Sequence, residues 1–489
     1  MYEDQRKYYA QNQQMLFQQP SLLNFFAGRC LHDVSKRDTL AGWHFWREHY
    51  WEENENGAIR LLVSGALASV YQKASEQVSR QVERDQKRGA NPEKEKQIKL
   101  LQARVEALKA SKRTDNMLNY VQTLSSVHGS KWDANPWLLG TRQGVIDLRT
   151  GTLRAGQPDD HLRTIIPTAW KGLDEPAPRF QQFLRELFSD REEGELEELL
   201  AFLQRVLGYG ITGHVSEHIF LMLYGEEGRN GKDTLMHVLE QVLGKTVGAV
   251  SDDVLISRGR VGSPGAARPH LCNLQGKRIA WVSESNRDAR FAIEQIKQLT
   301  GGGAIVARQL YAREYTFAPS HLLILLTNYQ PEADPADSAF WERLCPVVFN
   351  VRFVEKPEWD NERLRDPKLA DVLAAEASGI LAWLVRGALE WQRLGLAIPA
   401  GVRQARQEYH RAESSVQDFI SQCCILDPAA RTPAHQLYKR YKRWTSENDI
   451  ELVSNKQFAR EIKQVREITC ARSKHGIAYI GVRLAKEPE

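Results

Sequence analysis

The sequence predicts a multidomain α/β protein with a parallel sheet in its central domain, a helical N-terminal region and a C-terminal winged helix. The chain has 489 residues, which is enough for several domains of about 100–200 residues each. Between residues 201 and 355, short apolar runs alternate with amphipathic stretches, as is typical of a parallel α/β domain. Residues 431–489 carry 13 lysines and arginines against 7 acidic residues, although the whole chain has a net charge of only +4.

The pattern along the chain predicts five segments. Residues 71–130 are rich in helix formers, and Ile98, Leu101, Val105 and Leu108 keep the spacing of one helix face. An aromatic run at residues 42–51 is interpreted either as a surface that stacks on bases or as ordinary core and turn, which is favoured. The segments are a largely helical N-terminal region (1–130), a small domain with a β-hairpin (131–200), the parallel α/β domain (201–355), a helical segment (356–412) and a winged helix (413–489).

The composition favours a protein of the reducing cytoplasm. No apolar run approaches the roughly 20 residues that cross a membrane, and the first residues are polar, unlike a signal peptide. Six cysteines are scattered without a C-x-x-C pair, so neither a zinc ribbon nor a disulfide framework is expected. We therefore expect a cytoplasmic protein without a membrane partner.

The α/β domain opens with a strand, a turn and a helix. Residues 218–224 are an apolar strand, and apolar residues between Leu235 and Leu243 share one face of the helix that follows. The turn between them, Gly-Glu-Glu-Gly-Arg-Asn-Gly-Lys-Asp-Thr at 225–234, is similar to a phosphate-binding loop with two departures. It is one residue longer than G-x-x-x-x-G-K-[ST], and Asp233 stands where that pattern has a hydroxyl.

The setting of this turn predicts a nucleotide site. A phosphate chain needs free backbone N–H groups at a helix N-terminus and a nearby cation. The alternative is a polar turn that merely contains Gly-Lys, and the strand–turn–helix context favours nucleotide binding. The candidate ATP-binding residues are Gly225, Gly228, Asn230, Gly231, Lys232, Asp233 and Thr234.

Three later residues are catalytic candidates. Glu284 ends a second apolar strand, where a carboxylate can orient an attacking water or help to hold Mg²⁺. Asn328 ends a third apolar strand and can sense a γ-phosphate or position water. Arg343 can reach a phosphate in a neighbouring subunit, as arginine fingers do, although an isolated arginine is more typical of a surface ion pair.

Two regions carry candidate DNA contacts. Residues 304–317 alternate like a hairpin, and the cations and the aromatic near its tip either grip a DNA strand or are simply solvated. Along residues 454–465, the apolar side chains are expected to face inward. The basic side chains then lie on another face, where they could contact the major groove of DNA. A lysine-rich surface that aids solubility is the alternative there, and the charge asymmetry favours nucleic acid. The candidates are Arg308, Tyr311 and Arg313 in the hairpin and Lys456, Arg460 and Lys463 in the tail.

In their order and spacing, these blocks resemble superfamily-three helicases of the AAA+ class. The similarity is to the phage/plasmid primase C-terminal family, which is related to poxvirus helicase–primases, and it covers roughly residues 110–485. The resemblance implies ATP and Mg²⁺ as cofactors, homo-oligomeric rings that are commonly hexamers, and movement along single-stranded DNA. It also implies a phosphate-loop lysine at Lys232, an acid at Glu284, a polar sensor at Asn328, a finger at Arg343, and a channel hairpin region from Lys297 through Tyr311.

The chain departs from the family pattern at several positions. Gly302-Gly303 stand where relatives often have Gly-Asp, and Glu342-Arg343 where they often have two arginines. No primase-like module is expected before residue 110, so priming is not implied. The candidate metal ligands are Asp233, Thr234 and Glu284. One hypothesis is that Asp233 and Ser283 exchange the usual hydroxyl and carboxylate roles around the metal; a hydroxyl shifted to Thr234 is the simpler alternative.

The expected function is that of an ATP-dependent, ring-forming DNA helicase in the replication of a phage, plasmid or other mobile element. Single-stranded DNA is expected in the ring channel and duplex DNA at the winged helix, and a separate primase or polymerase is a further candidate partner. The alternative is a non-catalytic origin-binding or loading protein whose assembly is controlled by nucleotide binding. Glu284 discriminates between them, because a switch protein has no need of a catalytic acid.

Overall fold

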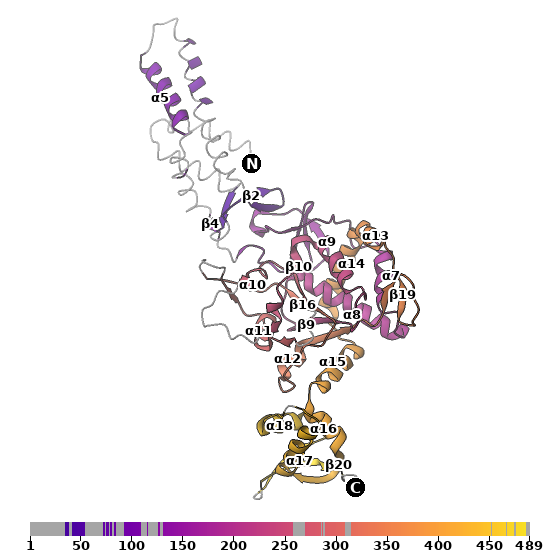
Figure 1. The fold of residues 1–489 in the computed structure, drawn as a ribbon. Helices are drawn as coiled ribbons and strands as arrows, with labels where there is room; N and C mark the ends of the chain where they lie inside the picture. Colours follow the sequence, from indigo (N-terminus) through magenta and orange to yellow (C-terminus); the bar gives the residue numbers. More distant parts are fainter. Residues whose placement is uncertain are drawn as a thin grey trace. The chain divides into compact units, whose positions relative to one another are not determined.

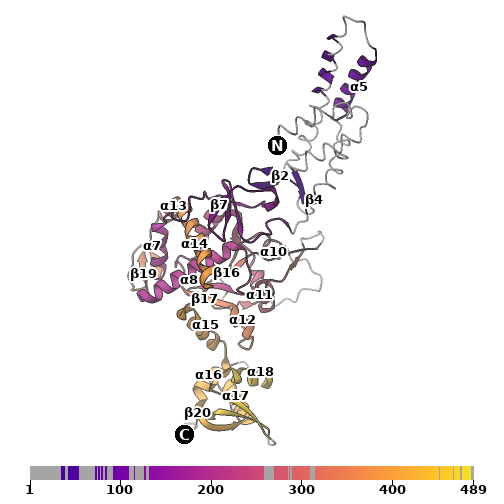
Figure 2. The ribbon, with the colours of Figure 1, turned by 180° about the vertical axis from the view of Figure 1, so that it is seen from behind.

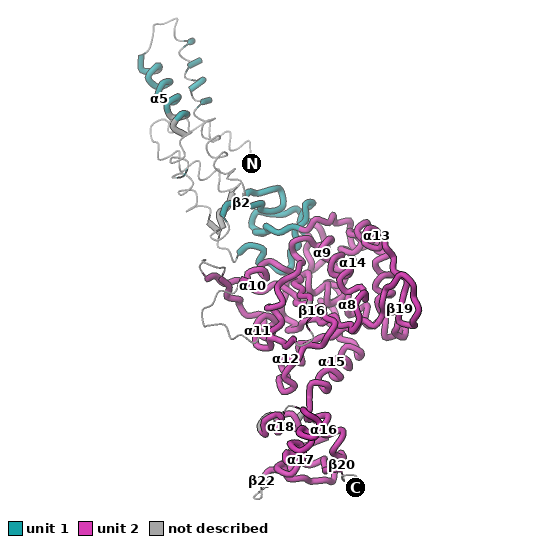
Figure 3. Tube along the Cα trace, viewed as in Figure 1, with its two compact units in different colours: residues 1–145, 154–165 teal, residues 146–153, 166–489 magenta. Residues whose placement is uncertain are grey.

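The computed structural model describes most of the chain from residue 131 onward and parts of what precedes it. The chain divides into two compact units, one of residues 1–145 and 154–165 and the other of residues 146–153 and 166–489 (Figure 3). The described residues are 35–38, 42–53, 72–73, 75–77, 79–80, 83–84, 92–108, 115, 126–127, 131–257, 269–284, 286, 289–308, 314–450, 452–465, 467–473 and 476–485.

A small sheet lies in the first unit. The aromatic run forms a β-hairpin of β2 and β3 with Trp46 opposite Trp51, because aromatic side chains suit strands and gain from cross-strand pairing. Trp51 and Trp132 are buried together, which supports the core-and-turn interpretation. The prediction of a largely helical segment omits this sheet, although it includes the helix α5 (Pro92–Leu108). The strands are β1 (Ser35–Asp38), β2 (Gly42–Arg47), β3 (Tyr50–Glu53) and β4 (Ser126–Val127), in the order β3-β2-β1-β4.

The hairpin predicted within residues 131–200 is present. Its turn closes with hydrogen bonds from the Thr150 and Gly151 amides to the Asp147 carbonyl, at 3.2 and 2.8 Å. Gly151 has a φ of +71°, a left-handed conformation that glycine adopts without strain. The strands are β5 (Leu138–Thr141), β6 (Gly144–Asp147), β7 (Thr152–Arg154) and β8 (Ile165–Ile166), in the order β7-β6-β5-β8.

The second unit contains a five-stranded sheet in which every neighbouring pair is parallel (Figure 1). This confirms the predicted parallel α/β domain. Of the five strands in this sheet, β9 comes first in the sequence, and it lies between β16 and β17, the last two. The loop that follows β9 therefore leaves the sheet from an interior position. Both faces are covered, which is why the strands are continuously apolar. The strands are β9 (Phe220–Tyr224), β10 (Val247–Ala249), β12 (Ile279–Glu284), β16 (Leu322–Thr327) and β17 (Leu344–Val348), in the order β10-β12-β16-β9-β17.

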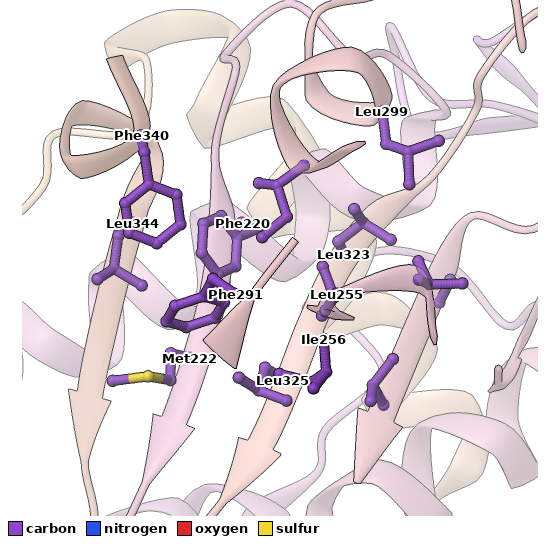
Figure 4. Packing of buried hydrophobic residues seen from close by; sticks show 14 of the residues in the cluster. Phe220, Met222, Leu255, Ile256, Phe291, Leu299, Leu323, Leu325, Phe340 and Leu344 are labelled. Carbon is purple, nitrogen blue, oxygen red and sulfur yellow. The ribbon is translucent and has the colours of Figure 1, made fainter. Parts of the chain in front are cut away.

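Aromatic side chains fill the core beside β9. Figure 4 shows Phe220, Phe291 and Phe340 gathered there, with ring centroids 4.9–5.8 Å apart. Leucines of β16 and β17 extend the same cluster. The short elements of this region are β11 (Ile256–Ser257), α10 (Pro269–Cys272), β13 (Arg290–Phe291), α11 (Ile293–Thr300), β14 (Ile305–Ala307), β15 (Tyr315–Phe317) and α12 (Ser338–Arg343).

Two long helices, α8 (Glu193–Thr212) and α14 (Ala377–Leu394), pack closely against each other (Figures 1 and 2). A Cβ on Gly208 would overlap the backbone of Gly387 and Ala388. A Cβ on Gly387 would overlap the carbonyl of Gln204. Glycine on both helices therefore sets how near the two axes can come. The other elements of this part are α7 (Pro178–Leu187), α9 (Lys232–Leu243), β18 (Arg352–Val354), β19 (Glu362–Leu364), α13 (Leu369–Ala375) and α15 (Ala400–Ala412).

The C-terminal segment has the element order of a winged helix. Its helices enclose a core that includes Phe419, Tyr441 and Phe458. The helix α17 begins at Ala434, with Pro433 as its N-cap residue. The elements are α16 (Ser415–Cys423), β20 (Cys424–Pro433), α17 (Ala434–Glu447), α18 (Asn455–Glu461), β21 (Thr469–Ser473) and β22 (Gly476–Leu484), with the antiparallel sheet order β20-β22-β21.

Within the described ranges, no single helix has the length and apolarity to cross a membrane. One bent pair, α13 with α14, meets that test by length and composition only, with a bend of 69°.

A buried histidine predicts a pH-dependent stability. His321 precedes β16, and neither of its ring nitrogens has a hydrogen-bond partner in the part of the chain that the structure describes. Burial lowers the pKa of His321 to about 4 from 6.5. As the pH falls below 6.5, the unfolded chain takes up this proton first, so the contribution to stability is complete above pH 6.5 and is lost toward pH 4. We expect a loss of about 2 kcal/mol at pH 5 from this group.

The measurement is urea unfolding of the wild type and of His321→Leu at pH 7 and pH 5. The variant has no ring to protonate, so the wild type should lose more stability than the variant between the two pH values. Identical losses in both proteins would contradict the prediction.

Candidate nucleotide site

The phosphate loop joins β9 to α9 at the carboxyl edge of the sheet. Gly231 precedes the first helical residue with a φ of +81°, and a Cβ there would overlap Leu187. A Cβ on Gly225 would lie 2.5 Å from the Phe349 carbonyl oxygen. Gly228 has no atom within 4 Å of such a Cβ, so no steric contact requires glycine at this position. Gly225 and Gly231 are therefore the glycines on which the loop conformation depends.

The structure brings two of the candidate site residues, Lys232 and Asn328, together. The lysine is only 4% exposed, and its Nζ donates to the Asn328 Oδ1 at 2.9 Å and to the Gly225 carbonyl at 3.2 Å. Burial lowers the pKa of Lys232 to about 8, and the charge of Asp233 partly opposes this shift. The amide of Asn328 thus fixes the position of the cation at the start of α9.

The strand register explains why these residues meet. Glu284 is paired with Thr327, and Thr327 with Tyr224, so three strands end at the same level. The Gly225 amide also donates to the Thr327 carbonyl at 3.2 Å. Glu284 therefore ends its strand at the edge that carries the phosphate loop. Its side chain lies outside the described side chains, and its catalytic role stays a prediction.

The additional residue of the loop is accommodated by contacts with β18. The Phe353 amide donates to the Arg229 carbonyl at 2.8 Å, and the Glu227 carboxylate forms an ion pair with Arg352 at 2.8 Å. Inside the loop, the Asn230 Nδ2 donates to the Glu227 carbonyl at 2.7 Å. Arg229 has a φ of +65°, which is uncommon for a residue other than glycine. Nothing in the sequence indicates that β18 contacts the loop, because these contacts join residues more than 120 positions apart.

A cavity of about 430 Å³ lies beside the first turn of α9. Gly231, Asp233 and Thr234 line it together with Phe183 and Phe353. Its volume is that of a small-molecule site, and it has both apolar and polar walls.

The residues in this place suit Mg²⁺. The exposed Asp233 and the half-buried Thr234 offer hard oxygen ligands on the cavity wall. Among the described residues, no group of three or more histidine, cysteine or acidic side chains forms a metal site by itself. Because Mg²⁺ typically takes one or two protein ligands and completes its shell with phosphates and water, the small donor set fits. Whether Asp233, Thr234 or Glu284 holds the ion stays a prediction.

Arg343 lies at the other edge of the sheet. It ends α12 immediately before β17, whose first residue pairs with Phe220 at the start of β9. Five residues of strand, about 16 Å, therefore separate it from the level of the phosphate loop. Its Nε donates to the Thr300 hydroxyl at 3.2 Å and its Nη1 to the Ala339 carbonyl at 2.6 Å. Arg343 cannot contact the phosphates of its own chain from this position.

The structure describes the base of the candidate DNA hairpin. β14 and β15 pair antiparallel with Ile305 opposite Phe317, whereas residues 309–313, with Tyr311 and Arg313, lie outside the described residues. Arg308 is half-buried. Lys297 is not in the hairpin but in α11, and its Nζ is 2.8 Å from both Glu294 and Asp337, which raises its pKa. Its ammonium is held by two carboxylates in this structure, and its DNA contact stays a prediction.

The tail helix has the predicted inward face. Phe458 and Ile462 are buried and Val465 packs against the same core. Lys463 is exposed, while the side chains of Lys456 and Arg460 lie outside those described. DNA binding by these three residues stays a prediction.

Comparisons with known proteins identify three regions. A "D5 N terminal like" model matches residues 24–189, a "Family of unknown function (DUF5906)" model matches 223–343, and a "Poxvirus D5 protein-like" model matches 413–476. The first covers the sheet of the first unit, the second begins in β9 and ends at Arg343, and the third runs from just before α16 to the start of β22.

Similar proteins occur in large DNA viruses. A "Putative helicase L207/L206" of Acanthamoeba polyphaga mimivirus is 27% identical over 331 residues, which cover 65% of this chain and 34% of that protein. A "Putative helicase 022R" of Frog virus 3 is 24% identical, with 65% and 40% covered. A "Putative primase C962R" of African swine fever virus is 21% identical, with 68% and 34% covered. The chain thus spans about a third to two fifths of the length of these relatives.

One solved structure, "The A form apo structure of NrS-1 C terminal region-CTR", matches over 92% of this chain and 96% of that one. The identity is 11% and the TM-score is 0.44, so this likeness adds nothing to the description of the site.

Proposed function

Because the chain carries D5 N-terminal-like and poxvirus D5-like domains and fits the poxvirus D5-like helicase–primase family, we propose that it is an ATP-dependent, ring-forming DNA helicase that translocates on single-stranded DNA. It serves the replication of a phage, plasmid or other mobile element. The names of the relatives support a helicase- or primase-like role in DNA replication. The proposal comprises ATP hydrolysis, ring formation and translocation, and it does not include priming.

The observation that carries the proposal is the hydrogen bond between Lys232 and Asn328 at the carboxyl edge of a parallel sheet. In open parallel sheets, ligands bind at this edge. A buried cation at a helix N-terminus, next to glycines whose conformation is fixed, is an arrangement for phosphate. The neighbouring strand delivers Glu284 to the same edge.

Each residue has a defined part in the proposed hydrolysis. The Lys232 ammonium neutralises charge that develops on the transferred phosphoryl group, and Asn328 keeps it in position. The Glu284 carboxylate orients the attacking water and accepts its proton. Bound Mg²⁺ would supply further charge neutralisation, with Asp233, Thr234 and Glu284 as its candidate ligands.

The position of Arg343 supports a multi-subunit site. It is fixed at the edge opposite to its own phosphate loop, and Arg343 can therefore act only on the nucleotide of a neighbouring copy. The exposed Lys463 and the predicted basic face of the tail helix support contact with DNA.

A test of the proposal measures phosphate release with and without single-stranded DNA for the wild type and Glu284→Gln. Removal of the general base should reduce DNA-stimulated release at least about 100-fold, while binding of labelled ADP is retained. Glu226→Gln, which neutralises an exposed carboxylate of the loop itself, is the matched control and should leave release within about threefold of the wild type.

Unchanged phosphate release in Glu284→Gln would overturn the helicase proposal and favour the nucleotide-switched loading protein. Native mass measurements with and without ATP and single-stranded DNA test ring formation separately. A chain that stays monomeric under every condition would contradict the ring.

A further inference from the structure

The phosphate loop carries more negative than positive charge. Residues 225–234 contain three carboxylates, at Glu226, Glu227 and Asp233, against two cations, at Arg229 and Lys232. Glu227 is neutralised by Arg352 at 2.8 Å, and Glu226 is exposed and does not line the cavity. Asp233 is exposed and lines the cavity with Gly231 and Thr234. Asp233 is therefore the loop carboxylate that lines the cavity, whose wall also carries Arg229, Arg365, Glu355 and Asp366.

This carboxylate occupies the region where a phosphate would be attracted. The N-terminus of α9 and the Lys232 ammonium favour an anion there, and Asp233 already supplies one in the first helical turn. A phosphate on the loop would lie near the carboxylate, and like charges repel strongly where water is partly excluded. A serine or threonine hydroxyl in this place would cause no such repulsion.

We propose that Asp233 makes nucleotide binding depend on a divalent metal ion. Without the ion, the carboxylate repels the phosphate chain. With the ion, the carboxylate and the phosphates become ligands of a shared cation, because Mg²⁺ is commonly held by one or two carboxylates together with substrate phosphates. The inference rests on the proposed function, since it concerns the same loop, and it adds that the metal controls affinity as well as hydrolysis.

The experiment measures equilibrium binding of fluorescently labelled ADP to the full chain, in Mg²⁺ and in EDTA. Asp233→Ser removes the charge and restores a hydroxyl, so metal-free binding should tighten at least about tenfold and the gain in affinity from Mg²⁺ should shrink. Asp233→Asn removes the charge without adding a hydroxyl, so metal-free binding should again tighten, and Mg²⁺ should no longer improve the affinity.

Glu226→Gln is the matched control, because it removes the same charge from the same loop at a residue that does not line the cavity. It should leave the ratio of the two affinities unchanged. An equal tightening of metal-free binding in Glu226→Gln would overturn the proposal in favour of the overall charge of the loop. Parallel weakening of both affinities in Asp233→Ser and Asp233→Asn would also overturn it, because Asp233 would then act only on helix stability. Thermal melting of each variant verifies folding.

The two proposals fail in different ways. A wild-type chain that binds labelled ADP equally well with and without Mg²⁺ overturns the metal dependence and leaves the proposed helicase standing. A wild-type chain that binds labelled ADP in neither condition overturns both.

Discussion

Replacing Arg343 by alanine is expected to reduce ATP hydrolysis about 1,000-fold while nucleotide binding and assembly persist, since an arginine finger contributes roughly 10³–10⁵ in rate. The expected loss rests on the proposed role of Arg343 as a finger. Its guanidinium lies at the edge of the sheet opposite to its own Lys232, so this role requires a neighbouring copy. Phosphate release and native mass of the variant are the measurements. Arg403→Ala, at an exposed arginine of α15, is the control and should retain activity.

Mixing two inactive variants tests the trans arrangement directly. Lys232→Ala keeps the finger and loses the phosphate loop, whereas Arg343→Ala keeps the loop and loses the finger. In randomly mixed rings, roughly a quarter of the interfaces join an intact loop to an intact finger, so about a quarter of the wild-type activity should return. Co-assembled variants that remain inactive would contradict action across the interface.

Gly208→Ala is expected to destabilise the second unit by about 3 kcal/mol, the upper end of what overpacking a core usually costs. The added Cβ overlaps the backbone of Gly387 and Ala388 on the facing helix, so no rotamer change relieves it and α8 and α14 must move apart. Alanine is otherwise the better helix former, and the clash must outweigh that gain. Urea unfolding followed by circular dichroism measures the effect.

The same helix provides the control for this prediction. Gly194 lies in the first turn of α8, and nothing lies within 4 Å of a Cβ built there. Gly194→Ala should therefore be neutral or stabilising by up to about 1 kcal/mol. If both substitutions shift the unfolding midpoint by the same amount, the close approach of the helices does not determine stability.

The central fold and the cation of the site could be predicted because their signals are local. A strand, a glycine-rich turn and an amphipathic helix are consecutive in the chain, and their periodicity identifies them without any distant contact. Lys232 begins the helix after the glycine-rich turn and Asn328 directly follows a parallel strand, so the sequence placed both residues at one end of the sheet, although their hydrogen bond was not itself predicted. Identification of the hairpin at 305–317 rests on the same kind of alternation.

What could not be predicted depends on contacts between distant segments. The ion pair of Glu227 with Arg352 and the meeting of Gly208 with Gly387 each join residues more than 120 positions apart. The candidate DNA contact Lys297 forms an ion pair with Asp337 at the start of α12, a residue 40 positions away in the sequence. The N-terminal sheet was not predicted, because the aromatic run alternates too irregularly to distinguish a strand from a buried helix.

The placement of Arg343 and the phosphate loop at opposite edges has an arithmetic consequence. If each catalytic centre is shared between two copies, an isolated copy has none, and an open row of n copies has n−1. Only closure of the ring makes the number of centres equal the number of copies. Under the proposed function, hydrolysis per copy should then rise with protein concentration and fall on dilution.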